Sequence, residues 1–286
     1  MSGLEIISPF ELRNKLNHSE LRIFDVSTAL VPSMSGVGYD AFPLEENWIA
    51  CRIPNSMYID VPRYLSEQTK VIRVGVPSKK KVTRFMLTFN LGIDDPIVLY
   101  EQSPSIWATR VWWMLFILGF KRVSILDGGI KEWEALGYEI ETSVTSYSHA
   151  KFEENIDKSV FVDKDVTLGS MNKSDCTLLN ALTSDIHKGE NPRYGRPGRI
   201  PGSLNIPFHE LVDSETGKLV SPEKAMKVFS QENISSDDNI LNYCGGGIAA
   251  TLNAFIQRQL GFKNMQIYDN SMSEWAMDST LPIETD

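Results

Sequence analysis

The chain has 286 residues, of which 42% are hydrophobic and 23% charged, and its formal net charge is −9. This composition is that of a globular protein with one large domain or two of ordinary size. The negative charge argues against a nucleic acid or an anionic membrane as partner, and the longest apolar run, 111–120, is too short to cross a bilayer.

The first half alternates short helices and strands. A helix is predicted to begin at Ser8, because Ser8, Pro9 and Glu11 supply an N-cap, a proline at the first helical position and a capping-box carboxylate. Apolar runs predict strands at 21–26, 57–60, 97–100 and 122–126. The long apolar run after the third strand predicts a buried helix over 110–118 that ends at Gly119.

The second half repeats this order. A helix is predicted to begin at Asp163, and strands are predicted at 176–179, 204–206, 239–243 and 265–268. A helix from Ile248 through Leu260, ending at Gly261, follows the third of these strands. Alternating strands and helices favour a parallel sheet covered on both faces, in which ligands bind beyond the carboxyl ends of the strands.

The two halves also match in sequence. The segment Asp-Gly-Gly-Ile-Lys-Glu-Trp at 127–133 recurs as Asp-Asn-Ser-Met-Ser-Glu-Trp at 269–275, and Leu-Gly-Phe at 118–120 recurs at 260–262. A repeat of this length indicates two homologous domains, because the units of a solenoid are far shorter. We therefore expect one domain at 1–141, a polar linker at 142–154 and a second domain at 155–286.

One cysteine stands at the end of a predicted strand. Cys244 follows the strand at 239–243 and precedes three glycines and a helix. Glycines let successive N–H groups point at one spot, and such surroundings favour negative charge on sulfur, which makes a cysteine a reactive nucleophile. A lone cysteine is more often a packing residue, but packing requires no glycine-rich turn, so we interpret Cys244 as a nucleophile.

The other cysteines, Cys51 and Cys176, lie far from Cys244 and from each other, with no CxxC spacing. Three dispersed thiols are typical of a reducing compartment. No secretory signal is visible, so we expect a cytoplasmic protein. The four histidines form no ligand pattern, and we expect neither a metal nor another cofactor.

The duplication and the cysteine loop together resemble the tandem-domain rhodanese family, sulfurtransferases of the thiosulfate or 3-mercaptopyruvate type, over nearly the whole chain. The marks of the family are the segments 110–113, 127–129, 199–207 and 244–249, together with Trp133. The resemblance implies an α/β fold of two homologous rhodanese-like domains, each a mostly parallel sheet with helices on both faces. It also implies a first domain without the catalytic cysteine, since Glu101 occupies that position.

The resemblance further implies that Cys244 takes a sulfane sulfur from a small-molecule donor as a persulfide. A thiol, cyanide or an acceptor protein then collects the sulfur, in two covalent steps that give ping-pong kinetics without a cofactor. The implied substrate-binding residues are Gly245, Gly246, Gly247, Ile248, Ala249 and Arg193.

Several positions depart from the family pattern and leave the donor open between thiosulfate and 3-mercaptopyruvate. Leu182 replaces a substrate-binding arginine, Gly246 replaces a basic residue or a Ser/Thr, and Arg52 replaces a histidine. Arg196 and Arg199 lie beside Arg193, and surface roles for all three remain open. The alternative function is a non-catalytic sulfur carrier or protein-interaction module. A phosphatase of this fold would need an arginine where residue 250 is alanine.

Overall fold

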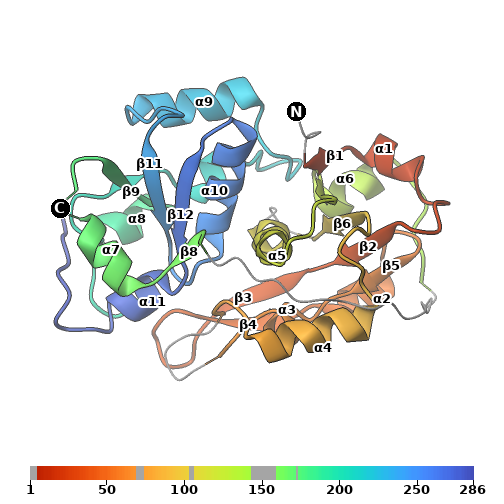
Figure 1. Ribbon diagram of the computed structural model, residues 1–286, viewed down its shortest axis with the longest axis horizontal. Helices are drawn as coiled ribbons and strands as arrows, with labels where there is room; N and C mark the ends of the chain where they lie inside the picture. The colour runs from red at the N-terminus through yellow and green to blue at the C-terminus, as the bar shows by residue number, and fades with distance from the viewer. Residues whose placement is uncertain (1–4, 69–73, 103–105, 143–158, 172) are drawn as a thin grey trace.

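The computed structural model describes residues 5–68, 74–102, 106–142, 159–171 and 173–286, and shows two α/β halves side by side (Figure 1). The predicted linker, 142–154, lies outside the described residues except for Thr142. None of the helices in these ranges is both long and apolar enough to cross a membrane.

Each half contains one five-stranded sheet in which every pairing is parallel. In the first half the strand order is β1 (Ile6–Ile7), β7 (Val123–Leu126), β6 (Ile97–Tyr100), β2 (Arg22–Asp25) and β5 (Ser56–Tyr58). In the second half it is β8 (Phe161–Val162), β12 (Asn264–Tyr268), β11 (Asn239–Tyr243), β9 (Cys176–Asn180) and β10 (Leu204–Asn205). The two orders correspond strand by strand, so the expected pair of parallel-sheet domains is confirmed.

The helices follow the same plan. Those of the first half are α1 (Pro9–Arg13), α2 (Glu45–Ala50), α3 (Val61–Tyr64), α4 (Lys79–Phe89), α5 (Ile106–Ile117) and α6 (Gly129–Ala135). Those of the second are α7 (Lys164–Ser170), α8 (Ser184–Lys188), the 3₁₀ turn η1 (Phe208–Leu211), α9 (Pro222–Gln231), α10 (Ala249–Gln259) and α11 (Ser271–Trp275). Ser8 caps α1 with the predicted capping box, whereas α5 begins one turn before the predicted start.

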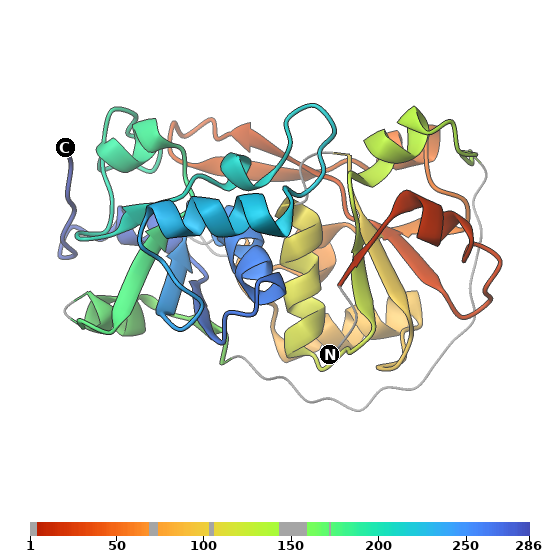
Figure 2. The same cartoon turned by 90° about the horizontal axis from the view of Figure 1, so that it is seen from above.

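The helices α5 and α10 pack against each other at the centre of the molecule (Figures 1 and 2). At their contact the hydroxyls of Thr109 and Thr251 lie 3.1 Å apart. These two threonines hold equivalent positions in the repeat, so the halves are related by an approximate two-fold axis between them. Because α5 is buried almost all round, the apolar run that predicted it forms part of the core between the halves.

The repeated aspartates make reciprocal contacts across this axis. Asp127 of the first half accepts a hydrogen bond of 3.0 Å from the N–H of Leu219 in the second. Asp269 of the second half accepts one of 2.7 Å from the N–H of Val76 in the first. The motif that revealed the duplication therefore joins the two halves.

An antiparallel hairpin that the sequence pattern did not predict extends from the first half along the second (Figures 1 and 2). It consists of β3 (Thr28–Pro32) and β4 (Tyr39–Pro43). Near its turn the N–H of Gly38 donates a 2.7 Å hydrogen bond to the carbonyl of Arg193, and the ring of Tyr39 lies 6.3 Å from that of Tyr194. The hairpin thus brings residues of the first half to the carboxyl edge of the second sheet.

Candidate active site

Cys244 follows β11 directly, at the carboxyl edge of the second sheet, and is 2% exposed. Its N–H donates to the hydroxyl of Ser271 at 3.0 Å, and its carbonyl accepts from the N–H of Met272 at 3.0 Å. Ser271 has a left-handed backbone, with φ of 49°, and its hydroxyl donates to the carbonyl of Tyr268. The start of α11 therefore fixes the cysteine backbone from both sides.

The three positions after Cys244 differ in how strictly they require glycine. Gly247 has φ of 72°, and a Cβ there would lie 2.2 Å from the carbonyl oxygen of Asp269. A Cβ on Gly245 would lie 1.7 Å from the hydroxyl of Tyr194. A Cβ on Gly246 would meet only ordinary van der Waals contact. Space and backbone conformation thus require glycine at two of the three positions.

This turn leaves a row of N–H groups without protein acceptors. Within the described residues, none of the backbone N–H groups from Gly245 to Ala250 donates a hydrogen bond to another protein atom. They belong to the turn that follows the cysteine and leads into α10, whose N-terminal end carries a partial positive charge. Such an arrangement stabilises an anion.

The equivalent loop of the first half contains a carboxyl group of its own. Glu101 follows β6 as Cys244 follows β11, and its carbonyl accepts from the N–H of Ile130 at 3.2 Å. Its side-chain oxygen Oε1 accepts from the N–H of Ala108 in the first turn of α5, at 2.8 Å. Burial raises the pKa of this carboxyl to about 8. In the first half, the carboxyl group after the strand thus accepts a hydrogen bond from the helix that follows it. At the equivalent position, the second half has the sulfur of Cys244.

Arg110, on α5 of the first half, holds the cysteine loop of the second. It is fully buried, and its Nη1 lies 2.7 Å from Oδ1 of Asp269. Nη1 also donates to the carbonyl of Gly247 at 3.0 Å, and Nη2 donates to that of Val74 at 2.7 Å. The sequence marked this arginine as a feature of the family but indicated no contact with the cysteine loop.

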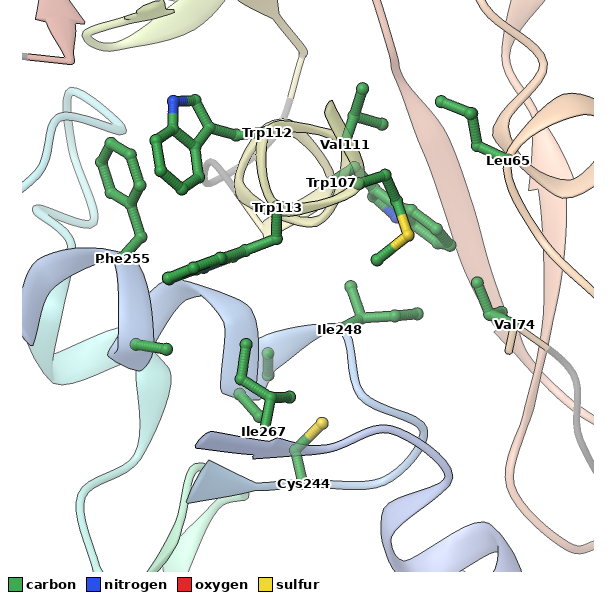
Figure 3. Packing of buried hydrophobic residues seen from close by; sticks show 14 of the residues in the cluster. Leu65, Val74, Trp107, Val111, Trp112, Trp113, Cys244, Ile248, Phe255 and Ile267 are labelled. Atoms are coloured by element: carbon green, nitrogen blue, oxygen red, sulfur yellow. The ribbon is translucent and has the colours of Figure 1, made fainter. Parts of the chain in front are cut away.

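A cleft of about 270 Å³ lies over Cys244. Its walls are mostly apolar and come from both halves: Leu30, Tyr39 and Ile106 from the first, and Leu182, Ile186 and Phe208 from the second. Figure 3 shows Cys244 at the end of its strand, beside the apolar cluster around α5, with its sulfur directed toward Ile248, which also lines the cleft.

A larger hollow of about 830 Å³, between Lys15 and Arg122, lies at the amino ends of the strands of the first sheet. The cleft, and not that hollow, is at the edge where parallel sheets bind ligands.

Most of the site residues predicted from the sequence meet at this cleft. Cys244, Gly245, Gly246, Ile248 and Ala249 line it. Two predicted residues do not. Gly247 faces Asp269 instead, and the guanidinium carbon of Arg193 lies 5.2 Å from the ring centroid of Tyr39, which itself lines the cleft.

The two neighbouring arginines have structural contacts. Arg196 donates to four backbone carbonyls between residues 275 and 281. Arg199 forms ion pairs with Glu284 and Asp286. Nearby, burial first and the charge of Arg199 second lower the pKa of His187 to about 4, so this histidine is neutral at pH 7.

Tyr194 is a site residue that sequence reasoning missed. It lines the cleft, is 7% exposed and has its hydroxyl against Gly245. Among the described residues this hydroxyl has no hydrogen-bond partner. Burial first, and then the charge of Cys244, raise the pKa of Tyr194 well above its usual range, so the hydroxyl stays protonated and can donate. The only sequence signal was its place between Arg193 and a glycine.

Two similar parallel-sheet domains, one of which bears a cysteine loop at a shared cleft, define the class of this protein. The Rhodanese-like domain family matches residues 8–136 and 180–278, and the chain belongs to this family.

The chain is similar over its length to named sulfurtransferases. It is 28% identical to the probable 3-mercaptopyruvate sulfurtransferase of Pseudomonas aeruginosa, over 100% of this chain and 99% of that relative. It is also 28% identical to the mitochondrial thiosulfate/3-mercaptopyruvate sulfurtransferase 1 of Arabidopsis thaliana, over 98% of this chain and 78% of the relative. The crystal structure of SseA from Escherichia coli superimposes with a TM-score of 0.82 at 22% identity, covering 94% of this chain and 98% of that one. The interpretation as a sulfurtransferase with two rhodanese-like domains is confirmed.

Proposed function

We propose that the chain moves a sulfane sulfur from thiosulfate or 3-mercaptopyruvate to a thiophilic acceptor through a persulfide on Cys244. The observation that carries this proposal is the position of Cys244, which lies at the floor of the cleft beside N–H groups that have no protein acceptor. The similarity to named thiosulfate and 3-mercaptopyruvate sulfurtransferases supports the choice of donors. The acceptor is cyanide, a thiol or an acceptor protein.

In the first step the thiolate of Cys244 attacks the outer sulfur of the donor. A bond forms between the two sulfur atoms, and the bond between the outer sulfur and the rest of the donor breaks. Thiosulfate leaves as sulfite. 3-Mercaptopyruvate leaves as pyruvate, after the proton of its thiol has moved to carbon. The enzyme retains a persulfide anion.

The persulfide anion is stabilised by the residues around it. N–H groups from Gly245 to Ala249 provide donors fixed before the reaction, as in an oxyanion hole. The protonated hydroxyl of Tyr194 is a further donor on the cleft side. In the second step the acceptor attacks the outer sulfur, the sulfur–sulfur bond breaks, and Cys244 leaves as a thiolate.

Arg193 is proposed as an electrostatic contributor, because one aromatic ring separates its guanidinium from the cleft. The proposed domains are residues 1–141 and 155–286, joined by a linker at 142–154. The three free cysteines support a cytoplasmic location. Neither nucleic acid nor membrane is a proposed partner.

Steady-state kinetics with each donor and cyanide test the proposal. We expect parallel double-reciprocal lines, because sulfur leaves one substrate before the other binds, and complete loss of turnover in Cys244→Ser. The matched control is Cys176→Ser, a free and half-buried cysteine outside the cleft, which should keep normal turnover. Comparable loss in both variants would contradict the assignment of Cys244. A sulfur carrier would accept one sulfur atom but show no turnover.

A further inference from the structure

The cleft over Cys244 contains no charged side chain among the described residues that line it. Its polar groups are neutral: the hydroxyls of Thr183 and Ser273, and those of two tyrosines. The rest of the lining is the sulfur of Cys244, the backbone of Gly245 and Gly246, and apolar side chains. An ion that loses water in this space would therefore meet no opposite charge on a lining side chain; the guanidinium of Arg193 lies behind the ring of Tyr39.

The arginine side chains nearest to the cleft have partners outside it. Arg110 pairs with Asp269, and Arg199 pairs with carboxylates at the C-terminal end of the chain. Arg196 is bonded to backbone carbonyls, and Arg193 lies on the ring of Tyr39. The loop N–H groups and the neutral hydroxyls are the donors that remain, and in the second half-reaction the persulfide itself occupies the N–H groups.

On the basis of the proposed function, we propose that the sulfur acceptor of this cleft is an uncharged organic thiol with an apolar body, such as a small aromatic or branched aliphatic thiol. The donor needs only to reach Cys244 and the loop N–H groups. The acceptor meets a loaded enzyme, in which these groups are taken and apolar walls surround the outer sulfur.

The size of the cleft agrees with a small acceptor. Its volume of about 270 Å³ lies just below the range of roughly 300–1,000 Å³ typical of sites for drug-sized ligands. Leu182 and Ile186 form one wall and Leu30 of the hairpin lies on the wall of the first half, so an aromatic ring or branched chain would be in contact on two sides. Burying such a group is favourable, whereas burying an unpaired carboxylate is costly.

The second half-reaction then balances as follows. The sulfur of the thiol attacks the outer sulfur of the Cys244 persulfide, and a new sulfur–sulfur bond forms. The bond between the outer sulfur and Cys244 breaks, and the thiol proton ends on the product persulfide. Cys244 is left as the thiolate that began the cycle, and no oxidant or reductant is consumed.

Leu182 is the residue we assign to this specificity. It is 7% exposed, follows β9 and is held by its N–H, which donates to the side chain of Asn180 at 3.0 Å. Leu182→Arg places a cation in the wall of the cleft. Leu87→Arg adds the same charge at an exposed position of α4, outside the cleft, and is the matched control.

The test uses two thiols that differ by one carboxylate, benzyl mercaptan and 4-(mercaptomethyl)benzoic acid. The wild-type enzyme is loaded with 3-mercaptopyruvate or thiosulfate, freed of donor, mixed with each thiol and followed by intact mass. We expect the second-order rate constant of persulfide loss, corrected for the thiolate fraction, to be at least tenfold higher for benzyl mercaptan. We expect Leu182→Arg to reduce or reverse this ratio and Leu87→Arg to leave it unchanged.

The outcomes separate this inference from the proposed function. If no persulfide forms on Cys244, the proposed function fails. If the persulfide forms but wild-type enzyme discharges to both thiols at equal rates, or faster to the carboxylate, only the inference about the acceptor is overturned. The wild-type comparison does not depend on the folding of any variant.

Discussion

Gly247→Ala should disable the enzyme, although the change adds a single methyl group. The residue adopts φ of 72°, a left-handed conformation, and its added Cβ would lie 2.2 Å from the carbonyl oxygen of Asp269. The left-handed backbone costs alanine about 1–2 kcal/mol. Relieving the overlap requires the loop to move by roughly 1 Å, and overpacking of this kind costs about 1–3 kcal/mol.

The two costs add to about 2–5 kcal/mol. If the loop stays in place, the free energy of unfolding falls by this amount; if the loop is displaced, the loss of stability is smaller. Displacement moves the N–H groups away from the sulfur, and a misplacement of about 1 Å can slow a reaction by about 10²-fold. We therefore expect Gly247→Ala to form the persulfide at least tenfold more slowly, to unfold at lower urea concentration, or both.

Gly246→Ala is the matched control. Its backbone is not left-handed, and its Cβ would lie 3.7 Å from the hydroxyl of Ser273, an ordinary contact. Persulfide formation in a single turnover and urea unfolding should both stay close to wild type in this variant. Equal effects of the two substitutions, or a fully active and stable Gly247→Ala, would refute the reasoning from loop geometry.

Three further predictions follow from buried groups. Arg110→Ala leaves Asp269 without its buried partner and should lower the free energy of unfolding by about 3–5 kcal/mol in urea titrations; a loss below about 1 kcal/mol would contradict the proposed hold on the loop. Tyr194→Phe removes the donor proposed for the persulfide anion, so we expect about 10–100-fold slower persulfide formation in rapid-quench experiments with an unchanged melting temperature; an unchanged rate would remove this tyrosine from the mechanism. Since burial raises the pKa of Glu101 from 4.5 to about 8, the folded state keeps a proton that the unfolded chain releases, and stability falls as pH rises between these values. Glu101→Gln should therefore raise the thermal midpoint at pH 8 and change it little at pH 4.5, and an equal shift at both values would contradict this.

Local sequence patterns predicted the elements whose causes are local. The strand β11 is a short apolar run, and α10 ends where predicted because Gly261 adopts φ of 87° just beyond it. Ser8, Pro9 and Glu11 form the capping box that starts α1. Since the cysteine loop lies between β11 and α10, most of the candidate site could be found from the sequence.

Features that depend on the other half could not be found in this way. The first turn of α5 is missing from the prediction because that helix is buried almost all round and has no amphipathic period to mark its start. Two partners of Arg110, Asp269 and Gly247, lie far along the chain on the second half, so the sequence showed the arginine but not these contacts. The hairpin of β3 and β4 and the placement of Tyr194 likewise depend on contacts between the halves.

The intact mass of the purified protein, measured after incubation with thiosulfate and with 3-mercaptopyruvate, reveals a persulfide on the enzyme itself. We expect the wild-type protein to gain the mass of one sulfur atom, cyanide to remove it, and Cys244→Ser to gain nothing. Unchanged mass of the wild-type protein with both donors, or an equal gain in Cys244→Ser, would contradict the persulfide mechanism on Cys244.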